Sequence, residues 1–262
     1  MTSIDRREFV RAVGTVGALS LAGWPTRSSS RPIRAVAFDG FALFDATAVV
    51  PAAEALAPGR GAALVAAWRA RHFEYQWLRT LGGRYEDFQK TASDALLFAT
   101  RSLGIDLSDT QRRELVEAQG MLRPWPDAAA AIDELRAEGV SLSLLSNMTS
   151  TMLIDGLRRA GLARDFRFVL STDRVRLAKP APQAYAMATT AFDLPRDAIA
   201  FVAFAGWDVA GATWFGYPTA WLNRSHAADE QLDANPSITA GDLASVVRWI
   251  KSNPEPARAG AD

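Results

Sequence analysis

The chain has 262 residues, of which 49% are hydrophobic and 22% charged, a composition typical of a soluble globular protein with one domain or two modest ones. Lys plus Arg and Asp plus Glu both total 29, so the formal net charge is +0 and the balance gives no reason to expect nucleic acid as a partner. With no cysteine and only two histidines, the chain lacks thiol nucleophiles, disulfides and the ligands of most zinc hydrolase sites. Any catalysis therefore has to use carboxylates, hydroxyls, Lys or Arg.

The N-terminus has the pattern of an export signal. Arg6 and Arg7 precede an apolar stretch from Ala12 to Leu21 that is too short to span a bilayer, which is similar to a twin-arginine signal. Residues 1–31 are therefore predicted to be a signal and linker without stable membrane insertion, and the protein to be periplasmic or secreted. A frayed amphipathic helix in a cytoplasmic protein is the alternative.

The first element of the folded part is a strand over residues 33–38, whose continuous apolar character suits a strand buried on both faces. Three helices follow without a strand between them, over residues 62–81, 85–102 and 108–119. After Pro124 the pattern changes to alternating strands and helices. The predicted strands cover 140–147, 168–170, 198–204 and 219–222, and the predicted helices cover 127–138 and 150–159, a segment after Pro182, and a short segment that ends at Gly216.

This order of elements predicts an α/β fold with a doubly wound parallel-sheet, Rossmann-like core. The core would consist of residues 32–45 and 124–252, and a helical cap over residues 46–123 would be inserted after the first strand. Residues 253–262 would form a disordered tail. Ligands of such sheets bind at the carboxyl ends of the strands, where the cap would lie.

Polar side chains follow the predicted strands at this edge. Asp39 comes directly after the first strand, Ser146 and Asn147 end the second, and Asp208 follows the strand at 198–204. Lys179 lies in a loop before Pro180. Each residue alone could be a helix cap or a surface charge, but their joint placement at one edge predicts a site.

In chain order these residues are Asp39, Ser146 and Asn147, Lys179, and Asp208. This order resembles the four motifs of the haloacid dehalogenase superfamily. Within it the chain is similar to the L-2-haloacid dehalogenases, because the stretches PGRGAALVAAWRARHFEYQWLRTLGGRYEDF, KPAPQAY and GWDVAGATWFGYPTAWLNR look like that branch. The resemblance extends from about residue 33 to 250. It implies the fold predicted above.

Phe41 separates this chain from the phosphatases of the superfamily. They carry a second aspartate two positions after the nucleophile, which binds magnesium and protonates the leaving alkoxide. An aromatic ring can do neither, but it can line an apolar pocket, and a halide leaves without needing a proton. The resemblance therefore implies a dehalogenase with no metal and no cofactor.

The resemblance also implies the catalytic roles. Asp39 would attack C2 of a short 2-haloalkanoic acid to form an aspartyl ester, and water would then release a 2-hydroxy acid. Arg69 matches the cap arginine that stabilises the departing halide, and helical spacing places it in a stripe with Phe73 and Trp77. Lys179 would keep Asp39 ionised. Asp208 would orient or deprotonate the water.

The remaining predicted site residues bind the substrate. Ser146 and Asn147 would hold its carboxylate through hydroxyl and backbone N–H groups. The other candidates share an aromatic ring and would line the pocket: Phe41, Phe73, Phe88, Tyr185 and Trp207. The expected partner is a small haloacid, and the resemblance suggests a homodimer.

The chain departs from the family pattern at three alanines. In the first motif, Ala42 lies in the stretch GFAL (residues 40–43), which supplies no hydroxyl where the family usually has a threonine. In the fourth motif, Ala203 and Ala205 replace the usual serine and asparagine before the Trp-Asp pair. One well-placed hydrogen-bond donor can contribute about 10²-fold in rate, so the loss of these donors could slow or redirect the dehalogenase reaction. Two alternatives to an active dehalogenase therefore stay open. They are another hydrolase of the superfamily, such as a phosphatase, which Phe41 disfavours, and a catalytically impaired protein that binds a small carboxylate.

Overall fold

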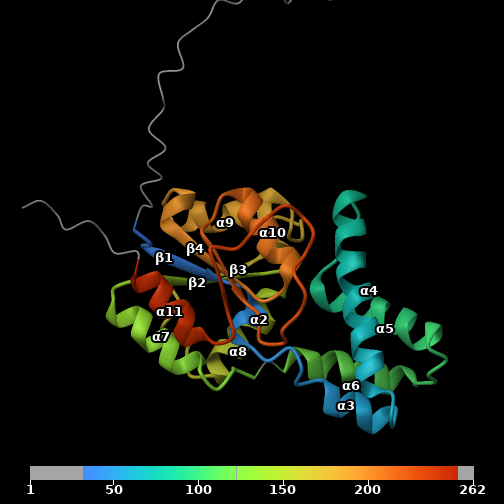
Figure 1. Cartoon of the computed structure of the whole chain (residues 1–262). Coiled ribbons are helices and arrows are strands. Elements are labelled where there is room, and N and C mark those ends of the chain that lie inside the picture. Colours follow the sequence, from blue (N-terminus) through green and yellow to red (C-terminus); the bar gives the residue numbers. More distant parts are fainter. Residues whose placement is uncertain (1–31, 122, 253–262) are drawn as a thin grey trace, which may run out of the picture.

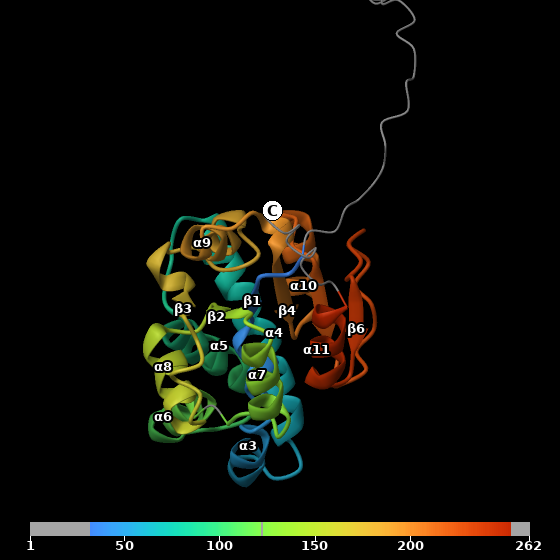
Figure 2. The same cartoon turned by 90° about the vertical axis from the view of Figure 1, so that its left-hand side faces the viewer.

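Six parallel strands form the centre of the protein, seen in a computed structural model that describes residues 32–121 and 123–252 (Figure 1). In chain order they are β1 (Ala35–Phe38), β2 (Ser141–Ser146), β3 (Phe168–Ser171), β4 (Ile199–Ala203), β5 (Thr219–Leu222) and β6 (Ile238–Ala240). Their spatial order is β3-β2-β1-β4-β5-β6. Figure 2 shows β3, β2, β1, β4 and β6 in this order from left to right. Strand β1 therefore lies in the middle, with Ala35 opposite both Ser141 and Ile199. This is the strand order of a Rossmann-like sheet.

Helices cover both faces of the sheet. On one face α7 (Ala128–Ala137), α8 (Ser150–Arg159) and α11 (Leu243–Lys251) pack on the side chains of Val36, Phe38 and their neighbours. On the other face α9 (Pro182–Phe192) and α10 (Gly206–Phe215) pack on Ala35, Ala37 and Phe201. Successive strand residues point to opposite faces, so the apolar runs are buried on both sides.

The insert after β1 is helical. It begins with the single turn α2 (Gly40–Leu43) and continues as α3 (Val50–Leu56), α4 (Gly61–Leu81), α5 (Phe88–Ser102) and α6 (Asp109–Gly120). The helices from α3 onward have a hydrophobic core of their own, centred on Leu64, Trp68, Leu96 and Leu115. This separate core lets the insert stand beside the sheet, on the right in Figure 1.

The chain leaves and re-enters the sheet region at one place. Phe44 and Pro124 form an isolated antiparallel bridge. Around it, the Asp45 N–H donates to the Arg123 carbonyl at 2.8 Å, and the Trp125 N–H donates to the Leu43 carbonyl at 2.9 Å. This junction agrees with the change of pattern at Pro124, while the proposed domain limits at residues 46 and 123 stay a prediction.

The predicted sheet, its parallel order and the helical insertion after β1 are confirmed. The helix predicted from Tyr85 begins instead at Phe88, because Asp87 caps it by accepting the Lys90 N–H at 2.8 Å. Sequence patterns predict neither β6 nor α11, although both are present. The predicted signal and linker (residues 1–31) and tail (residues 253–262) lie outside the described residues. In the described ranges no helix is long and apolar enough to cross a membrane.

Candidate active site

Asp39 stands at the carboxyl end of the central strand. It is the N-cap of α2, and its Oδ2 accepts the Phe41 N–H at 3.0 Å. Gly40 follows without a side chain, and a Cβ there would come within 3.0 Å of the Ser146 hydroxyl oxygen and the Met148 sulfur. Glycine at this position therefore lets β1 and β2 bring Asp39 and Ser146 together, and the Ser146 hydroxyl donates to Asp39 Oδ1 at 3.5 Å.

Lys179 joins two carboxylates. Its Nζ lies 2.8 Å from Asp39 Oδ1 and 2.6 Å from Asp208 Oδ2, and its side chain is 1% exposed. Burial works to lower the pKa of Lys179, but the charges of Asp208 and Asp39 outweigh it and raise that pKa above its ordinary value. Lys179 is thus an ammonium ion at any neutral pH, and it offsets the repulsion between the two acids.

Asp208 lies in the first turn of α10, where the helix N-terminus favours a negative charge. Its second hydrogen-bond partner, besides Lys179, is Tyr185, whose hydroxyl donates to Asp208 Oδ1 at 2.7 Å. Gly211 leaves room for that hydroxyl, since a Cβ there would come within 2.4 Å of it. Burial raises the pKa of Asp208 to about 6, with Lys179 opposing the rise and Asp39 adding to it. A carboxylate of this kind can act as a base near neutral pH.

The Asn147 side chain is fully used inside the protein. Its Nδ2 donates to Gln76 Oε1 at 2.8 Å, and its Oδ1 accepts the Lys179 N–H at 2.8 Å and the Thr172 hydroxyl at 3.2 Å. Because these contacts use the amide group of Asn147, a ligand would have to bind the backbone N–H of this residue instead. The expected role of Asn147 in carboxylate binding stays a prediction.

A small cavity opens above Asp39. Its volume is ≈ 70 Å³, and since a water molecule needs about 10–15 Å³ of such space, it holds roughly half a dozen non-hydrogen atoms. Its lining comes from both the sheet edge and the insert: Asp39, Phe41, Arg69, Phe73, Phe88, Ser146, Asn147, Lys179, Phe204, Ala205, Trp207 and Asp208.

Arg69 brings the only side-chain cation besides Lys179 to this lining. One of its guanidinium nitrogens donates to the Ala46 carbonyl at 2.7 Å, which fixes the head group. Burial lowers the pKa of Arg69, with Asp45 opposing the change. A partly desolvated guanidinium is a strong partner for an anion in the cavity.

The rest of the cavity wall is aromatic. Phe73 of α4 meets Trp207 at a ring-centroid distance of 5.1 Å, and Phe41 meets Phe204 at 6.2 Å. The indole N–H of Trp207 is buried and has no hydrogen-bond partner in the part of the chain that the structure describes. It is therefore a donor available to a bound ligand.

The structure brings the predicted site residues together, with one exception. All of them line the cavity except Tyr185, which is fully buried and lies behind Asp208. Of the three departing alanines, only Ala205 reaches the lining. Sequence reasoning missed Phe204 and Gln76. Strand alternation points to Phe204, because it follows the buried Val202 by two residues. Helical spacing points to Gln76, because it follows Arg69 by two helical turns.

The site does not suit a divalent metal. An ammonium group lies between the Asp39 and Asp208 carboxylates, and the side chain of Phe41 offers no oxygen ligand. Across residues 32–121 and 123–252, no group of three or more His, Asp or Glu side chains could hold a metal ion. The charged side chains of the cavity lining are Asp39, Asp208, Lys179 and Arg69.

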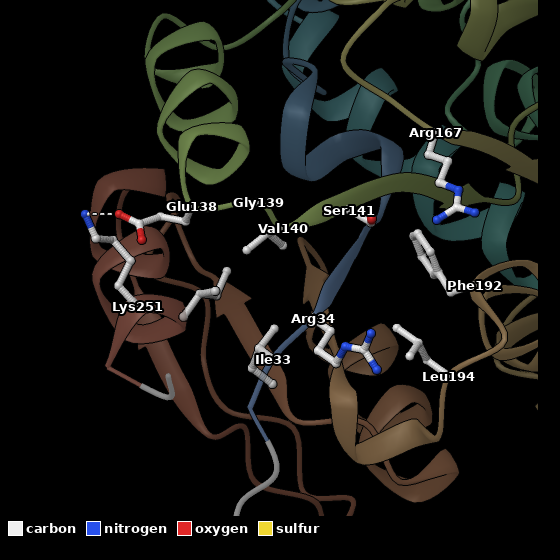
Figure 3. Close-up of a pocket in the computed structure, with 11 residues that line it drawn as sticks. Ile33, Arg34, Glu138, Gly139, Val140, Ser141, Arg167, Phe192, Leu194 and Lys251 are labelled. Carbon is white, nitrogen blue, oxygen red and sulfur yellow. Dashed lines mark ion pairs between the residues drawn. The ribbon is translucent and has the colours of Figure 1, made fainter. Parts of the chain in front are cut away.

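A larger cavity of ≈ 380 Å³ lies at the opposite edge of the sheet, where β1 and β2 begin (Figure 3). Glu138 and Lys251 form an ion pair of 2.9 Å on one side of it, and Arg34 and Arg167 lie on the other. Its lining contains no carboxylate next to a buried lysine. The arrangement that supports chemistry is the one around Asp39.

The sheet order, the helical insert and the strand-end site define a Rossmann-like hydrolase of the class that carries a helical insert after its first strand. The chain belongs to the haloacid dehalogenase-like hydrolases, whose family profile matches residues 26–216, and within them to the L-2-haloacid dehalogenase branch.

Three known proteins illustrate this membership. An (S)-2-haloacid dehalogenase from Pseudomonas sp. strain YL is 37% identical over 84% of this chain and 95% of its own length. The crystal structure of an L-2-haloacid dehalogenase has 38% identity and a TM-score of 0.82, covering 84% of this chain and 99% of that one. The L-2-haloacid dehalogenase from Xanthobacter autotrophicus, solved with chloropropionic acid covalently bound, has 30% identity and a TM-score of 0.76. The match covers 84% of this chain and 98% of that one.

Proposed function

We propose that the protein hydrolyses short (S)-2-haloacids to 2-hydroxy acids through an ester on Asp39. The observation that carries the proposal is the Asp39 carboxylate, held by Lys179 at 2.8 Å in a small aromatic cavity that Arg69 also lines. A carboxylate in such a site is paired with a cation, partly desolvated and oriented, which are properties that favour a nucleophile. The relatives named above carry the same activity in their names.

In the first step, a carboxylate oxygen of Asp39 bonds to C2 of the haloacid from the side opposite the halogen. The carbon–halogen bond breaks, and the halide leaves with the bonding electron pair, so that C2 is inverted. The guanidinium of Arg69 and the free indole N–H of Trp207 are the donors in the cavity that stabilise anions. No proton is transferred in this step, which agrees with a lining that lacks an acid at position 41.

In the second step, water attacks the acyl carbon of the Asp39 ester. Asp208 accepts a proton from the water, the acyl–oxygen bond breaks, and the 2-hydroxy acid leaves with a proton on its new hydroxyl group. One proton per turnover is released to solvent. Since the pKa of Asp208 is about 6, its carboxylate is available as the base at neutral pH.

The size of the cavity limits the substrate. A 2-halopropionate has six non-hydrogen atoms, which matches the roughly half a dozen that ≈ 70 Å³ can hold. Its carboxylate would be bound by the Ser146 hydroxyl and the Asn147 backbone N–H. Ala205 lines the cavity at a position where the family pattern has a polar side chain that would help to place the water, so we expect slower ester hydrolysis than formation.

Halide release tests the proposal. The protein would be assayed with (S)- and (R)-2-chloropropionate and chloroacetate, with and without a chelator, beside Asp39→Asn and the surface control Asp155→Asn. We expect release from the (S) enantiomer and a loss of more than about 10³-fold in Asp39→Asn only. No release, with melting still raised by 2-hydroxypropionate, would instead identify a carboxylate-binding protein, and activity abolished by the chelator would indicate a metal-dependent hydrolase.

We propose that the partner is a second copy of the chain. Leu78 and Leu81, which share one face in the last turn of α4, are 62% and 85% exposed, as expected for apolar side chains that another subunit covers. Sedimentation of the wild type should give twice the monomer mass, and Leu81→Asp should lower it. A wild type that sediments as a monomer at micromolar concentration would refute the dimer.

A further inference from the structure

The segment that carries Lys179 connects β3 to α9 and includes the short 3-10 turn η1 (Thr172–Arg174). It lies between the sheet edge and the insert. Lys179 has to place one ammonium group within hydrogen-bond reach of two carboxylates, at 2.8 Å and 2.6 Å, so a small displacement of its backbone would break one contact or both. What holds this segment in place therefore matters for the reaction.

Two side chains of the insert hold the segment directly. The Thr80 hydroxyl, near the end of α4, accepts the N–H of Ala178, the residue next to Lys179, at 3.0 Å. The Tyr85 hydroxyl, between α4 and α5, donates to the Asp173 carboxylate. Burial raises the pKa of Tyr85, with the Asp173 charge adding to the rise, so this phenol stays protonated and remains a donor.

A third side chain acts through Asn147. Gln76 Oε1 accepts the Asn147 amide at 2.8 Å, and the Oδ1 of Asn147 accepts the backbone N–H of Lys179 at 2.8 Å. Gln76 is itself held by His72, whose Nε2 is 3.0 Å from Gln76 Nε2. Burial lowers the pKa of His72 to about 3, so the ring is neutral and can accept the Gln76 N–H. This acceptor directs Gln76 Oε1 toward Asn147.

We propose that Gln76, Thr80 and Tyr85 are positioning residues through which the insert holds Lys179 between the two carboxylates. The three contacts come from one end of α4 and the loop after it, and they reach both ends of the Thr172–Lys179 segment. Lys179 therefore bridges the carboxylates only while the insert is seated on the sheet edge. The expected effect on kcat rests on the proposed function. The claim that the insert holds the Thr172–Lys179 segment does not.

The test uses the full chain with Thr80→Val, which removes the hydroxyl at nearly constant shape, and Thr80→Ser, which keeps it. Gln76→Leu tests the second route, and Thr100→Val is the matched control, because the Thr100 hydroxyl bonds to the Leu97 carbonyl of its own helix. Hydrogen exchange of the peptide over residues 172–179 and the kcat and KM for halide release are measured on each variant.

We expect exchange in this peptide to quicken by about three- to tenfold in Thr80→Val and Gln76→Leu. We also expect kcat to fall by about 10- to 100-fold with a much smaller change in KM, because Lys179 does not bind the substrate's apolar part. Thr80→Ser should restore both quantities, and Thr100→Val should change neither.

Unchanged exchange in both variants would overturn the proposal that the insert holds the segment. Faster exchange with unchanged kcat would overturn the claim that these contacts position Lys179. If the wild type releases no halide from any haloacid, the proposed function fails, and the exchange rates alone then decide whether the insert holds the segment.

Discussion

Replacement of Tyr185 by phenylalanine tests the role of Asp208. The change removes the hydroxyl that donates to Asp208 Oδ1 at 2.7 Å and keeps the buried ring. A hydrogen bond to a charged group contributes about 1.5–3 kcal/mol, and one pKa unit corresponds to about 1.4 kcal/mol. Because the lost bond favours the ionised form, the pKa of Asp208 should rise from about 6 by roughly one to two units.

The assay is the rate of 2-hydroxy acid formation between pH 5 and 9. A base works only when deprotonated, so the wild-type rate should increase with pH through about 6, and in Tyr185→Phe the same increase should occur near pH 7 to 8. Tyr75→Phe is the control, since Tyr75 packs on Phe98 in the insert. An unchanged pH profile in Tyr185→Phe would show that Asp208 is not the base whose ionisation limits ester hydrolysis.

Three further outcomes are expected. Lys179→Met leaves two buried carboxylates facing each other, so the free energy of unfolding should fall by about 3–5 kcal/mol in denaturant titrations, and stability equal to wild type would contradict the ion-pair geometry. Phe204→Ala enlarges the cavity, so the ratio of kcat/KM for 2-chlorobutyrate over chloroacetate should rise about tenfold or more; a constant ratio would mean that Phe204 does not limit substrate length. Arg6→Lys combined with Arg7→Lys should retain the protein in the cytoplasmic fraction of expressing cells, and unaltered fractionation would refute the twin-arginine route.

Much of the fold could be predicted from local patterns. The apolar run before Asp39 predicts β1, and the 3.6-residue period of apolar residues predicts α4. Both patterns are local in the sequence. Strand β6 has three residues, too few for a pattern to stand out, and it exists because β5 offers an edge to pair with. Its partner, and not its own sequence, makes it a strand.

The site was predictable where motifs mark the ends of strands, and less so where the insert meets the sheet. Asp39 and Asp208 belong to motifs, so their approach to Lys179 follows from the topology. The contact of Gln76 with Asn147 depends on how α4 is seated on the sheet edge, which no local spacing encodes. Tyr185 belongs to a motif, yet only the packing beside Gly211 shows that its hydroxyl points at an acid.

The central place of β1 has a consequence for the order in which the protein can fold. Both neighbours of this strand are synthesised long after it, and Asp39 is 140 residues from the lysine with which it pairs. Such non-local pairing makes folding slow and leaves an apolar strand without partners in the nascent chain. The insert, whose helices pack on a core of their own, can form before β2 and β4 are available to pair with β1. We therefore expect an early helical intermediate, with the sheet and its reactive carboxylate completed last.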